Sequence, residues 1–396
     1  MGQDRHSRHS MRPMQVIPAG SAIIAVTFGL ARYAYGLFLP AIRADFRLRT
    51  EAVGVIASGQ AAAYLLATVV ASVIAARVGP RLPVVVGGLS ATAGMLLIAT
   101  AHTVCLLAAG VVVAGASAGW AYPPLSDAVA RLVRTDGQSQ AVSAISAGTS
   151  YGVIVAGPIA LWAGPHWRLA WLAFAALAVV ATLWNARLLP TGPHGGSRKV
   201  LPRLRWSWFV CPRSRPLLLC AGAIGLASSV YWTFAVDLIS RGASSPALGR
   251  IFFVAVGCAG LAGALAGALV RRVGLRRALR WTLIGLAAAI ALLPLARSSG
   301  AAVLGSAVLF GGLYILVTGL LGVWTMNVFY RRPSAGLGAT LSLLAAGQLV
   351  GPALMGLLAD QVGLAVPFYL AGGLIAALAL VSPRVDIWSA VPGPPG

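Results

Sequence analysis

Long apolar runs without charged residues dominate this chain and limit the folds open to it. A helix needs about 20 apolar residues to cross the hydrocarbon core of a bilayer. Only 10% of the 396 residues are charged, against roughly 25% in soluble proteins. We therefore predict an all-α membrane protein with twelve transmembrane helices, whose expected bounds are 16–40, 53–76, 82–101, 104–130, 139–163, 169–189, 216–239, 247–270, 278–296, 300–330, 334–359 and 364–382.

The placement of the basic residues predicts how these helices are oriented. The formal net charge of +22 alone would suit a nucleic-acid-binding protein, but the basic residues gather in short loops between apolar runs. Most of these loops lie on the side of the N-terminal tail, as the positive-inside rule expects of cytoplasmic loops. We therefore expect a multi-pass protein of the bacterial inner (cytoplasmic) membrane with both termini in the cytoplasm. Its basic loops would contact anionic lipid, with no nucleic-acid partner.

Two pairs of short matches at a common spacing indicate an internal repeat. RVGPR at 77–81 matches RVGLR at 272–276, and Gly157-Pro158 matches Gly351-Pro352, each at the equivalent helix of its half. Two parallel six-helix halves enclose a cleft, and rocking of one half against the other gives alternating access. The expected parts are a cytoplasmic tail at 1–15, six-helix bundles at 16–189 and 216–382, a cytoplasmic linker at 190–215 and a cytoplasmic tail at 383–396.

The repeated loop resembles the motif after the second helix of major facilitator superfamily (MFS) transporters, G-x-x-x-D-R-x-G-R-R/K. Both copies lose the motif's acidic residue, since Ala76 and Arg271 stand in its place. How the inner gate is held without these acids stays open. The resemblance implies a gating role for the residues that both copies keep, which are Arg77, Gly79, Arg81, Arg272, Gly274 and Arg276.

Two other stretches extend the resemblance. GTSYGVIVAGP at 148–158 resembles the glycine-rich fifth-helix motif often found in the superfamily's proton-coupled exporters, and GQLVGPALMG at 347–356 echoes it. ARYAYGLFLPAIRADF at 31–46 resembles the first helix of a poorly characterised bacterial subgroup. The resemblance implies the MFS fold and a monomeric transporter, not an enzyme, with no cofactor. The two Gly-Pro pairs interrupt helix hydrogen bonds, so each is either a hinge or a static kink.

Arg32 lies near the middle of the first apolar run, where an arginine costs about 2.5–3.5 kcal/mol. Such residues usually face a bundle interior or a watery cavity. We predict that Arg32 points into the central cavity and binds an anionic or strongly polar group of the substrate. The alternative is a structural arginine bonded to helix carbonyls or to an acid on another helix. Tyr35 is expected to share its face, and the other cavity candidates are Gln60, Trp120, Tyr231, Trp232, Tyr314 and Gln348.

Acidic residues are scarce in the expected helices, which leaves Asp127 and Asp237 as candidates for proton coupling. Asp237 could close an outer gate against Arg43 or couple to Arg32, and both acids could equally lie at wet interfaces. No metal-binding or catalytic motif is present. We predict a secondary transporter that exports an amphipathic or weakly acidic organic molecule in exchange for protons. The alternatives are proton-coupled uptake of a small organic anion, or a non-transporting membrane sensor or enzyme.

Overall fold

The computed structural model describes residues 15–134, 137–192, 214–242, 247–295, 299–329 and 333–380, and every regular element within them is a helix. In these residues ten helices are long and apolar enough to cross a membrane, and two more are shorter, so the predicted twelve-helix, all-α membrane fold is confirmed. The ten are Gln15–Phe46, Thr50–Val78 (α3), Arg81–Ala99 (α4), Val104–Leu132 (α5), Gln140–Ala163, Trp167–Leu188 (α8), Arg215–Ser240 (α9), Leu275–Leu295 (α12), Gly300–Val328 (α13) and Gly336–Val362. The shorter two are Ala247–Gly263 and Ala365–Leu378 (α15).

Several of these spans are built from more than one helical segment. The first contains a π-helix, η1 (Ala25–Tyr33), which continues into α2 (Ala34–Phe46). The remaining segments are α6 (Gln138–Ser146), α7 (Gly148–Ala163), α10 (Ala247–Gly260), the 3-10 helix η4 (Leu261–Leu265), α11 (Ala266–Val273) and α14 (Pro333–Val362). The expected tails and most of the expected linker lie outside the described residues.

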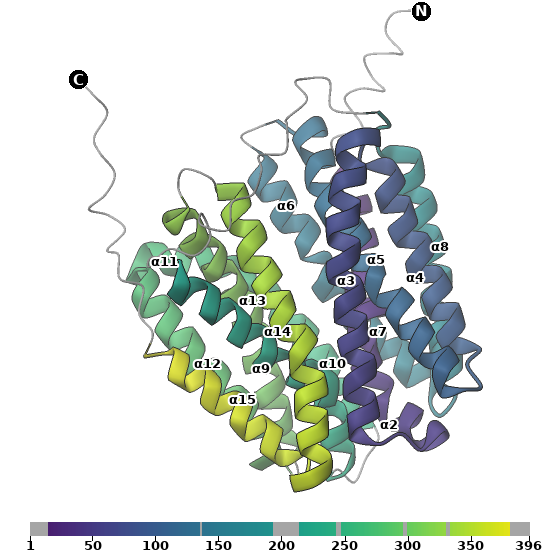
Figure 1. Ribbon diagram of the computed structural model, residues 1–396, viewed down its shortest axis with the longest axis vertical. Coiled ribbons are helices and arrows are strands. Elements are labelled where there is room, and N and C mark those ends of the chain that lie inside the picture. The colour runs from purple at the N-terminus through teal and green to yellow at the C-terminus, as the bar shows by residue number, and fades with distance from the viewer. Residues whose placement is uncertain are drawn as a thin grey trace, which may run out of the picture.

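The helices form two groups that follow chain order. In Figure 1 the purple and blue helices η1 to α8 lie on one side, and the green and yellow helices α9 to α15 lie on the other. We call them the N-terminal and C-terminal bundles. Small residues bring their helices together: a side chain on Gly94 of α4 would collide with Ala114 of α5. Such contacts suit a membrane protein, because no hydrophobic effect drives helices together inside lipid.

Both copies of the repeated loop begin with a glycine that ends a helix in a similar way. α3 ends at Val78 and α11 ends at Val273, and each is followed by a glycine with positive φ, 92° at Gly79 and 79° at Gly274. The N–H groups of these glycines donate to the carbonyls of Ala75 and Val270. Glycine adopts a positive φ without the steric cost that a side chain would bring. The sequence repeat is therefore also a structural repeat.

The two ends of the molecule differ in how closely the bundles approach. We name the ends after the loops they carry: the Arg47 end holds the loop between α2 and α3, and the Gly79 end holds the loop between α3 and α4. From mid-depth to the Arg47 end the bundles touch through backbone, since a side chain on Gly36 would strike the Trp232 carbonyl and one on Gly54 would strike the Pro352 carbonyl. Figure 1 shows α3 and α14 close at the lower, Arg47 end and diverging towards the top.

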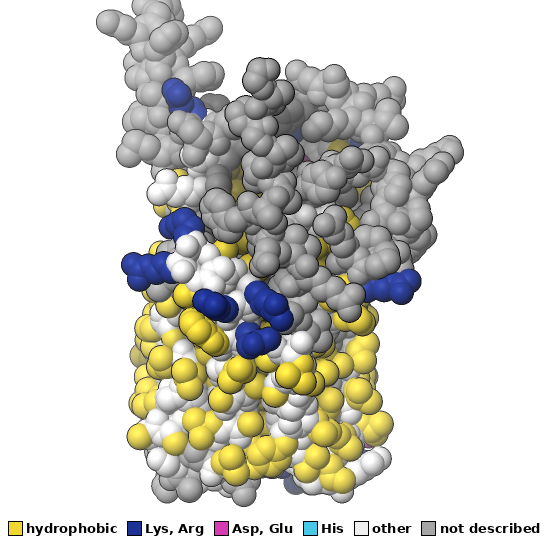
Figure 2. Space-filling view, turned by 90° about the vertical axis from the view of Figure 1, so that its left-hand side faces the viewer, with side chains coloured by type: hydrophobic (Ala, Val, Ile, Leu, Met, Phe, Trp, Pro, Cys, Tyr) yellow, Lys and Arg dark blue, Asp and Glu magenta, His cyan; other side chains and the backbone are white. Residues whose placement is uncertain are grey.

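The Gly79 end carries a basic surface beside an apolar one. In Figure 2 basic side chains form a band at the upper border of a face covered by hydrophobic side chains. Trp281 and Ile284 of α12 are 56% and 52% exposed, as expected of side chains that face lipid. The exposed basic residues of the neighbouring α11–α12 region are Arg271, Arg272, Arg276, Arg277 and Arg280. An apolar surface bordered by arginines matches a membrane protein whose basic loops lie at the head groups.

Candidate functional site

Arg32 lies at mid-depth between the two bundles. It belongs to η1, which packs closely enough on α7 that a side chain on Gly29 would strike the backbone of Gly152. Arg32 is only 7% exposed, and its Nη2 donates to Oε1 of Gln348 on α14 at 2.7 Å. π-Helical segments occur often at functional sites. The first span of one bundle therefore contacts the eleventh span of the other through this guanidinium.

The described side chains around the guanidinium are mainly aromatic. Its Cζ lies 4.0 Å from the ring centroid of Tyr64, and 5.7 Å from those of Phe28 and Tyr33. Gln60 donates to the backbone carbonyl of Arg32 at 3.2 Å. Within the described residues, no carboxylate lies within ion-pair distance of Arg32. Cation–π contacts thus provide part of the stabilisation that a buried cation usually takes from an acid.

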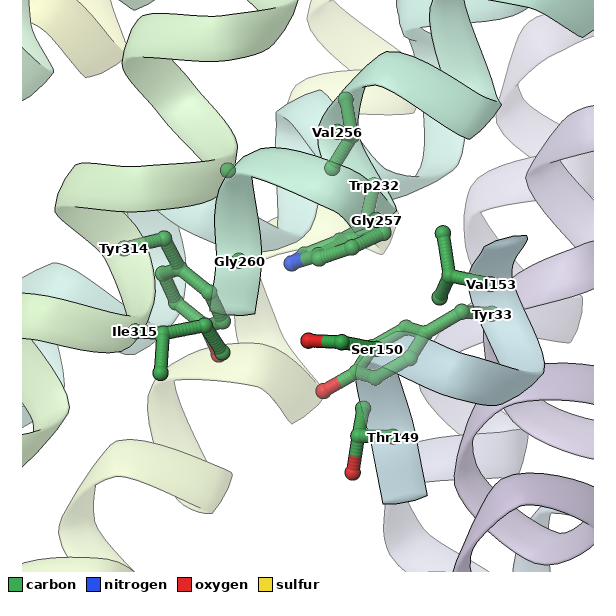
Figure 3. A pocket seen from close by; sticks show the side chains of 11 residues that line it. Tyr33, Thr149, Ser150, Val153, Trp232, Val256, Gly257, Gly260, Tyr314 and Ile315 are labelled. Carbon is green, nitrogen blue, oxygen red and sulfur yellow. The ribbon is translucent and has the colours of Figure 1, made fainter. Parts of the chain in front are cut away.

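A small pocket lies next to Arg32. Gln348 donates from Nε2 to the hydroxyl of Tyr314 at 3.1 Å, and Tyr314 lines the pocket with Tyr33, Ser150 and Trp232 (Figure 3). The cavity volume is about 20 Å³, enough for about one water molecule. In this conformation the pocket is too small for an organic substrate, so binding one requires the lining side chains to separate.

The side chains that line this pocket supply a stacking surface and a free donor. The rings of Tyr33 and Trp232 stack across the bundle interface with centroids 4.2 Å apart. The buried Nε1–H of Trp232 has no hydrogen-bond partner among the described residues, and it points towards the space between Tyr314 and Ser150 in Figure 3. A buried donor without a partner costs about 1–3 kcal/mol. A ligand oxygen at this place would recover that cost.

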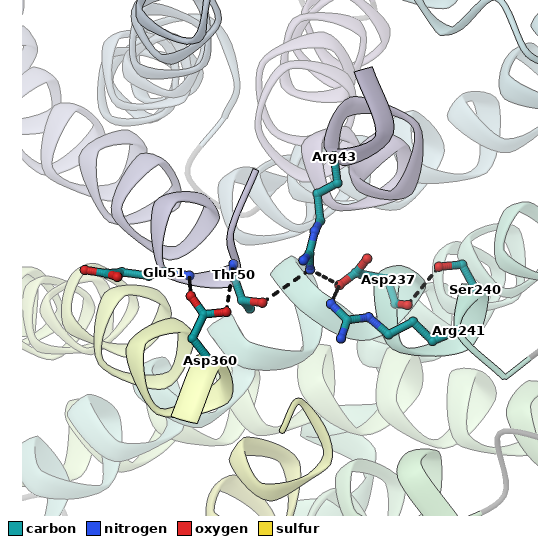
Figure 4. A network of polar contacts seen from close by, with 7 residues as sticks. All are labelled: Arg43, Thr50, Glu51, Asp237, Ser240, Arg241 and Asp360. Atoms are coloured by element: carbon teal, nitrogen blue, oxygen red, sulfur yellow. Dashed lines mark hydrogen bonds and ion pairs between the residues drawn. The ribbon is translucent and has the colours of Figure 1, made fainter. Parts of the chain in front are cut away.

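A polar network joins the bundles at the Arg47 end (Figure 4). We name it the gate cluster after the outer gate that the sequence led us to expect at Arg43 and Asp237. Asp237 Oδ2 lies 2.7 Å from Arg43 Nη1 and 2.9 Å from Arg241 Nη2. The carboxylate of Asp360 accepts the backbone N–H groups of Thr50 and Glu51, at 3.1 and 2.9 Å. These N–H groups open α3, where helix termini leave donors unpaired and attract negative charge. The gate cluster consists of Arg43, Thr50, Glu51, Asp237, Arg241 and Asp360.

Comparison with known proteins decides the family. The Major Facilitator Superfamily model matches residues 21–345. The chain belongs to the Major Facilitator Superfamily. No curated protein matches the sequence. Among solved structures, the nucleoside transporter NupG has a TM-score of 0.73 at 12% identity, over 93% of this chain and 97% of that chain. A bacterial homologue of the human lysosomal transporter Spinster, in an inward-facing and unoccupied conformation, has a TM-score of 0.69 at 14% identity, over 93% and 94%. At these identities the likeness shows the fold alone.

Three of the cavity candidates lie away from the pocket of this superfamily member. Tyr35 is 2% exposed in the core, with no partner for its hydroxyl. Tyr231 stacks on Phe310 inside the C-terminal bundle, with its hydroxyl beside that of Ser306. Trp120 packs against Gly87 of α4. From helical spacing we expected Tyr35 to share the face of Arg32, whereas the structure brings Tyr33 to the pocket. The π-helix explains this difference, because its wider turn changes which residues share a face.

The two candidate acids occupy opposite ends of the MFS fold. Asp237 contacts Arg43, one of its two expected partners, and does not contact Arg32. Asp127 is exposed on α5, one turn before Arg131 near the Gly79 end. Neither acid reaches the Arg32 site. Arg32 is therefore the charged group at the bundle interface at mid-depth in the described structure.

The motif residues of the superfamily lie at the Gly79 end. Gly79 abuts Gly192, whose carbonyl accepts Nη1 of Arg131 at 2.7 Å, so the first copy of the loop is tied within its own bundle. The basic residues of both copies, which are Arg77, Arg81, Arg272 and Arg276, are exposed.

The two Gly-Pro pairs lie inside α7 and α14, where a glycine allows close helix contact. Gly157 faces Val254 of α10, across the bundle interface, and Gly351 faces Ser229 of α9. Pro158 is exposed on α7, whereas the carbonyl of Pro352 faces Gly54 of α3. Both pairs are thus packing positions, which is compatible with either a hinge or a static kink.

Proposed function

We propose that the chain is a secondary transporter that carries a weakly acidic organic compound, as its anion, across the membrane by alternating access. The observation that carries this proposal is the buried guanidinium of Arg32, which has no carboxylate partner among the described residues and lies where the bundles meet. Arginine has five N–H donors, and one hydrogen bond to Gln348 uses only a small part of that capacity. A planar guanidinium can hold a carboxylate through two parallel hydrogen bonds.

The aromatic side chains favour a substrate with a planar apolar body. The rings of Phe28, Tyr33 and Tyr64 surround the guanidinium, and Trp232 stacks on Tyr33 from the other bundle. Aromatic rings bind flat apolar groups by offset or edge-to-face contact. An aromatic monocarboxylate such as benzoate fits this combination of one cation and several rings.

The contacts between the bundles support an inward-facing state. The gate cluster and the close glycine contacts lie between mid-depth and the Arg47 end. We infer that this end faces outwards, since the exposed arginines of α11 and α12 lie at the Gly79 end and basic loops favour the cytoplasm. Both termini are then cytoplasmic, in the inner membrane of a bacterium.

Export is the direction that the fifth span supports, because its glycine-rich stretch at 148–158 resembles that of exporters. Uptake of the same anion is the alternative. Proton coupling would require an acid that changes its charge as the site changes access. Asp237 already contacts two guanidinium groups, and Asp127 lies at the Gly79 end. The anion-binding role of Arg32 depends on neither acid.

A thermal-shift experiment on the purified full-length chain tests the proposal. Benzoate, indole-3-acetate and pyruvate are the anionic probes, and benzamide is a neutral control. A ligand that binds the folded state raises its melting temperature in a concentration-dependent way. We expect at least one carboxylate to stabilise the wild type but not Arg32→Ala. Arg187→Ala, which removes an exposed arginine of α8, should behave as the wild type does. The proposal would be overturned if a carboxylate stabilised all three proteins equally, or if no anion stabilised the wild type.

A further inference from the structure

We propose that transport is an obligatory exchange of anions: the bundles pass through the occluded state readily only when an anion neutralises Arg32. This inference rests on the proposed function and specifies how its cycle is coupled. It replaces the proton gradient with a counter-anion as the partner of transport. The positions and contacts of the acidic residues support this proposal.

Every acid in the described part of the chain is placed away from Arg32. Asp45 accepts the indole N–H of Trp167 and Nη1 of Arg168, at 2.9 and 2.7 Å. Asp237 contacts Arg43 and Arg241. The remaining described acids are Glu51 and Asp360 of the gate cluster and Asp127 near the Gly79 end. The Arg32 site thus has a fixed positive charge and no internal counter-charge within the described residues.

The guanidinium still has access to solvent in this conformation. Its hydrogen bond to Gln348 occupies Nη2. Nε and Nη1 have no hydrogen-bond partner in the described structure, and neither is among the fully enclosed side-chain atoms that lack a partner. The guanidinium is therefore not fully enclosed in this conformation, in which Arg32 keeps 7% of its surface exposed. Closure of the bundles at the Gly79 end would enclose it further, while the gate cluster still joins the bundles at the Arg47 end.

In the occluded state, with both ends closed, the lack of a carboxylate beside Arg32 raises the free energy of the empty transporter. A cation that loses its water and gains no counter-ion carries a large desolvation penalty, which the amide of Gln348 and the ring of Tyr64 offset only in part. A bound carboxylate removes this penalty by pairing with the guanidinium. The loaded transporter can therefore reorient in both directions, whereas the empty transporter reorients slowly. Net transport in one direction then requires an anion for the return step.

Efflux from proteoliposomes tests the exchange directly. Vesicles containing the full-length protein are loaded with radiolabelled benzoate and diluted into buffer without anionic substrate, into buffer with unlabelled benzoate, or into substrate-free buffer with an imposed pH gradient. We expect external benzoate to accelerate the loss of label at least about tenfold, which corresponds to a barrier difference of about 1.4 kcal/mol. The pH gradient should have little effect. We call the efflux rate with external benzoate divided by the rate without it the exchange ratio. Arg187→Ala should retain the exchange ratio of the wild type, because Arg187 is exposed on α8.

The substitution Gln348→Glu provides a second, independent arm. The new carboxylate would stand where Oε1 now accepts Nη2 at 2.7 Å, so the protein would carry its own counter-charge. We expect this variant to bind benzoate more weakly, while its exchange ratio falls towards one because the empty form can now reorient. Gln140→Glu is the matched control, since Gln140 is exposed on α6, and it should keep both the benzoate affinity and the exchange ratio of the wild type.

The outcomes separate this inference from the proposed function. Arg32-dependent benzoate efflux that ignores external benzoate and follows the pH gradient would overturn exchange and leave the transport proposal intact. An exchange ratio that persists in Gln348→Glu, with benzoate still bound, would also overturn it. Absence of saturable benzoate flux in every arm would overturn both proposals together.

Discussion

Arg43 of α2 and Asp237 of α9 form an ion pair across the bundle interface, with Nη1 and Oδ2 2.7 Å apart. They are 194 residues apart in sequence, close to the period of the internal repeat, so the pair joins equivalent spans of the two halves. The side chains are 20% and 6% exposed. Removal of one partner from an ion pair that is largely removed from water leaves the other charge unpaired, which costs more than the loss of a surface pair.

Removal of this ion pair should open the Arg47 end. We expect Asp237→Asn to shift the conformational equilibrium by about 1–3 kcal/mol, between the values of exposed and buried pairs. A cysteine at Thr233, one turn before Asp237 and 7% exposed, would report the change in a background without the four native cysteines. Its labelling by a membrane-impermeant thiol reagent should accelerate at least about fivefold. Exchange of the two charges, Arg43→Asp with Asp237→Arg, should restore slow labelling. Equal labelling rates in the parent protein, the Asp237→Asn variant and the charge-exchanged variant would contradict a gating role.

Asp360 should contribute to the same closure through a different contact. Its carboxylate accepts two backbone N–H groups at the start of α3, so it connects α14 to α3. Asp360→Asn keeps the shape but loses the negative charge that the helix terminus favours. We expect a loss of about 1 kcal/mol, measured as faster labelling of the Thr233 cysteine. Asp127→Asn, near the Gly79 end, is the comparison and should leave that rate unchanged.

The close approach of α3 and α14 should not tolerate a methyl group. A Cβ on Gly54 would strike the carbonyl of Pro352, a backbone atom that cannot move alone. Gly54→Ala should therefore disfavour the closed Arg47 end and increase labelling of the Thr233 cysteine. Gly305 of α13 has open space around it, so Gly305→Ala should leave labelling unchanged. Identical behaviour of the two variants would contradict the packing seen at Gly54.

The buried indole N–H of Trp232, which has no partner among the described residues, should contribute to benzoate affinity. Trp232→Phe removes a buried donor, and we expect benzoate affinity to fall about threefold to tenfold if a ligand oxygen accepts that donor. The comparison is Trp171, whose Nε1 is likewise buried without a partner but lies in the N-terminal bundle against Phe38 and Phe174. Trp171→Phe should preserve benzoate affinity. Calorimetric titration of both variants gives the answer, and equal affinities would exclude Trp232 from the site.

The sequence predicted the fold and one contact between the bundles, that of Arg43 with Asp237. Apolar runs of bilayer length give the helices, and the spacing of RVGPR and RVGLR predicts the repeat that Gly79 and Gly274 confirm in backbone geometry. Arg43 was one of two expected partners for Asp237, because a cation near the end of the first span and an acid near the same end of the seventh can meet. The capping of α3 by Asp360 was not predicted, since residues 310 positions apart carry no local pattern that joins them.

The cavity was harder to predict because helical periodicity fails where the helix is irregular. Tyr35 was expected beside Arg32 on α-helical spacing, yet η1 is a π-helix and Tyr33 lines the pocket instead. Tyr231 and Trp232 are neighbours in sequence, but Tyr231 faces the C-terminal core and Trp232 faces the other bundle. Adjacent helical residues point about 100° apart, and in an apolar helix the composition does not tell which direction is the interface.

Recognition of charge by Arg32 is the central claim, and the affinities for benzoate and for its neutral amide, benzamide, test it most directly. Calorimetric titration of the wild type should show benzoate binding at least about tenfold more tightly than benzamide, since hydrogen bonds between two charged groups contribute about 1.5–3 kcal/mol. In Arg32→Gln this preference should disappear. A preference for benzoate that remains unchanged in Arg32→Gln would contradict the account, because the anion would then be held elsewhere.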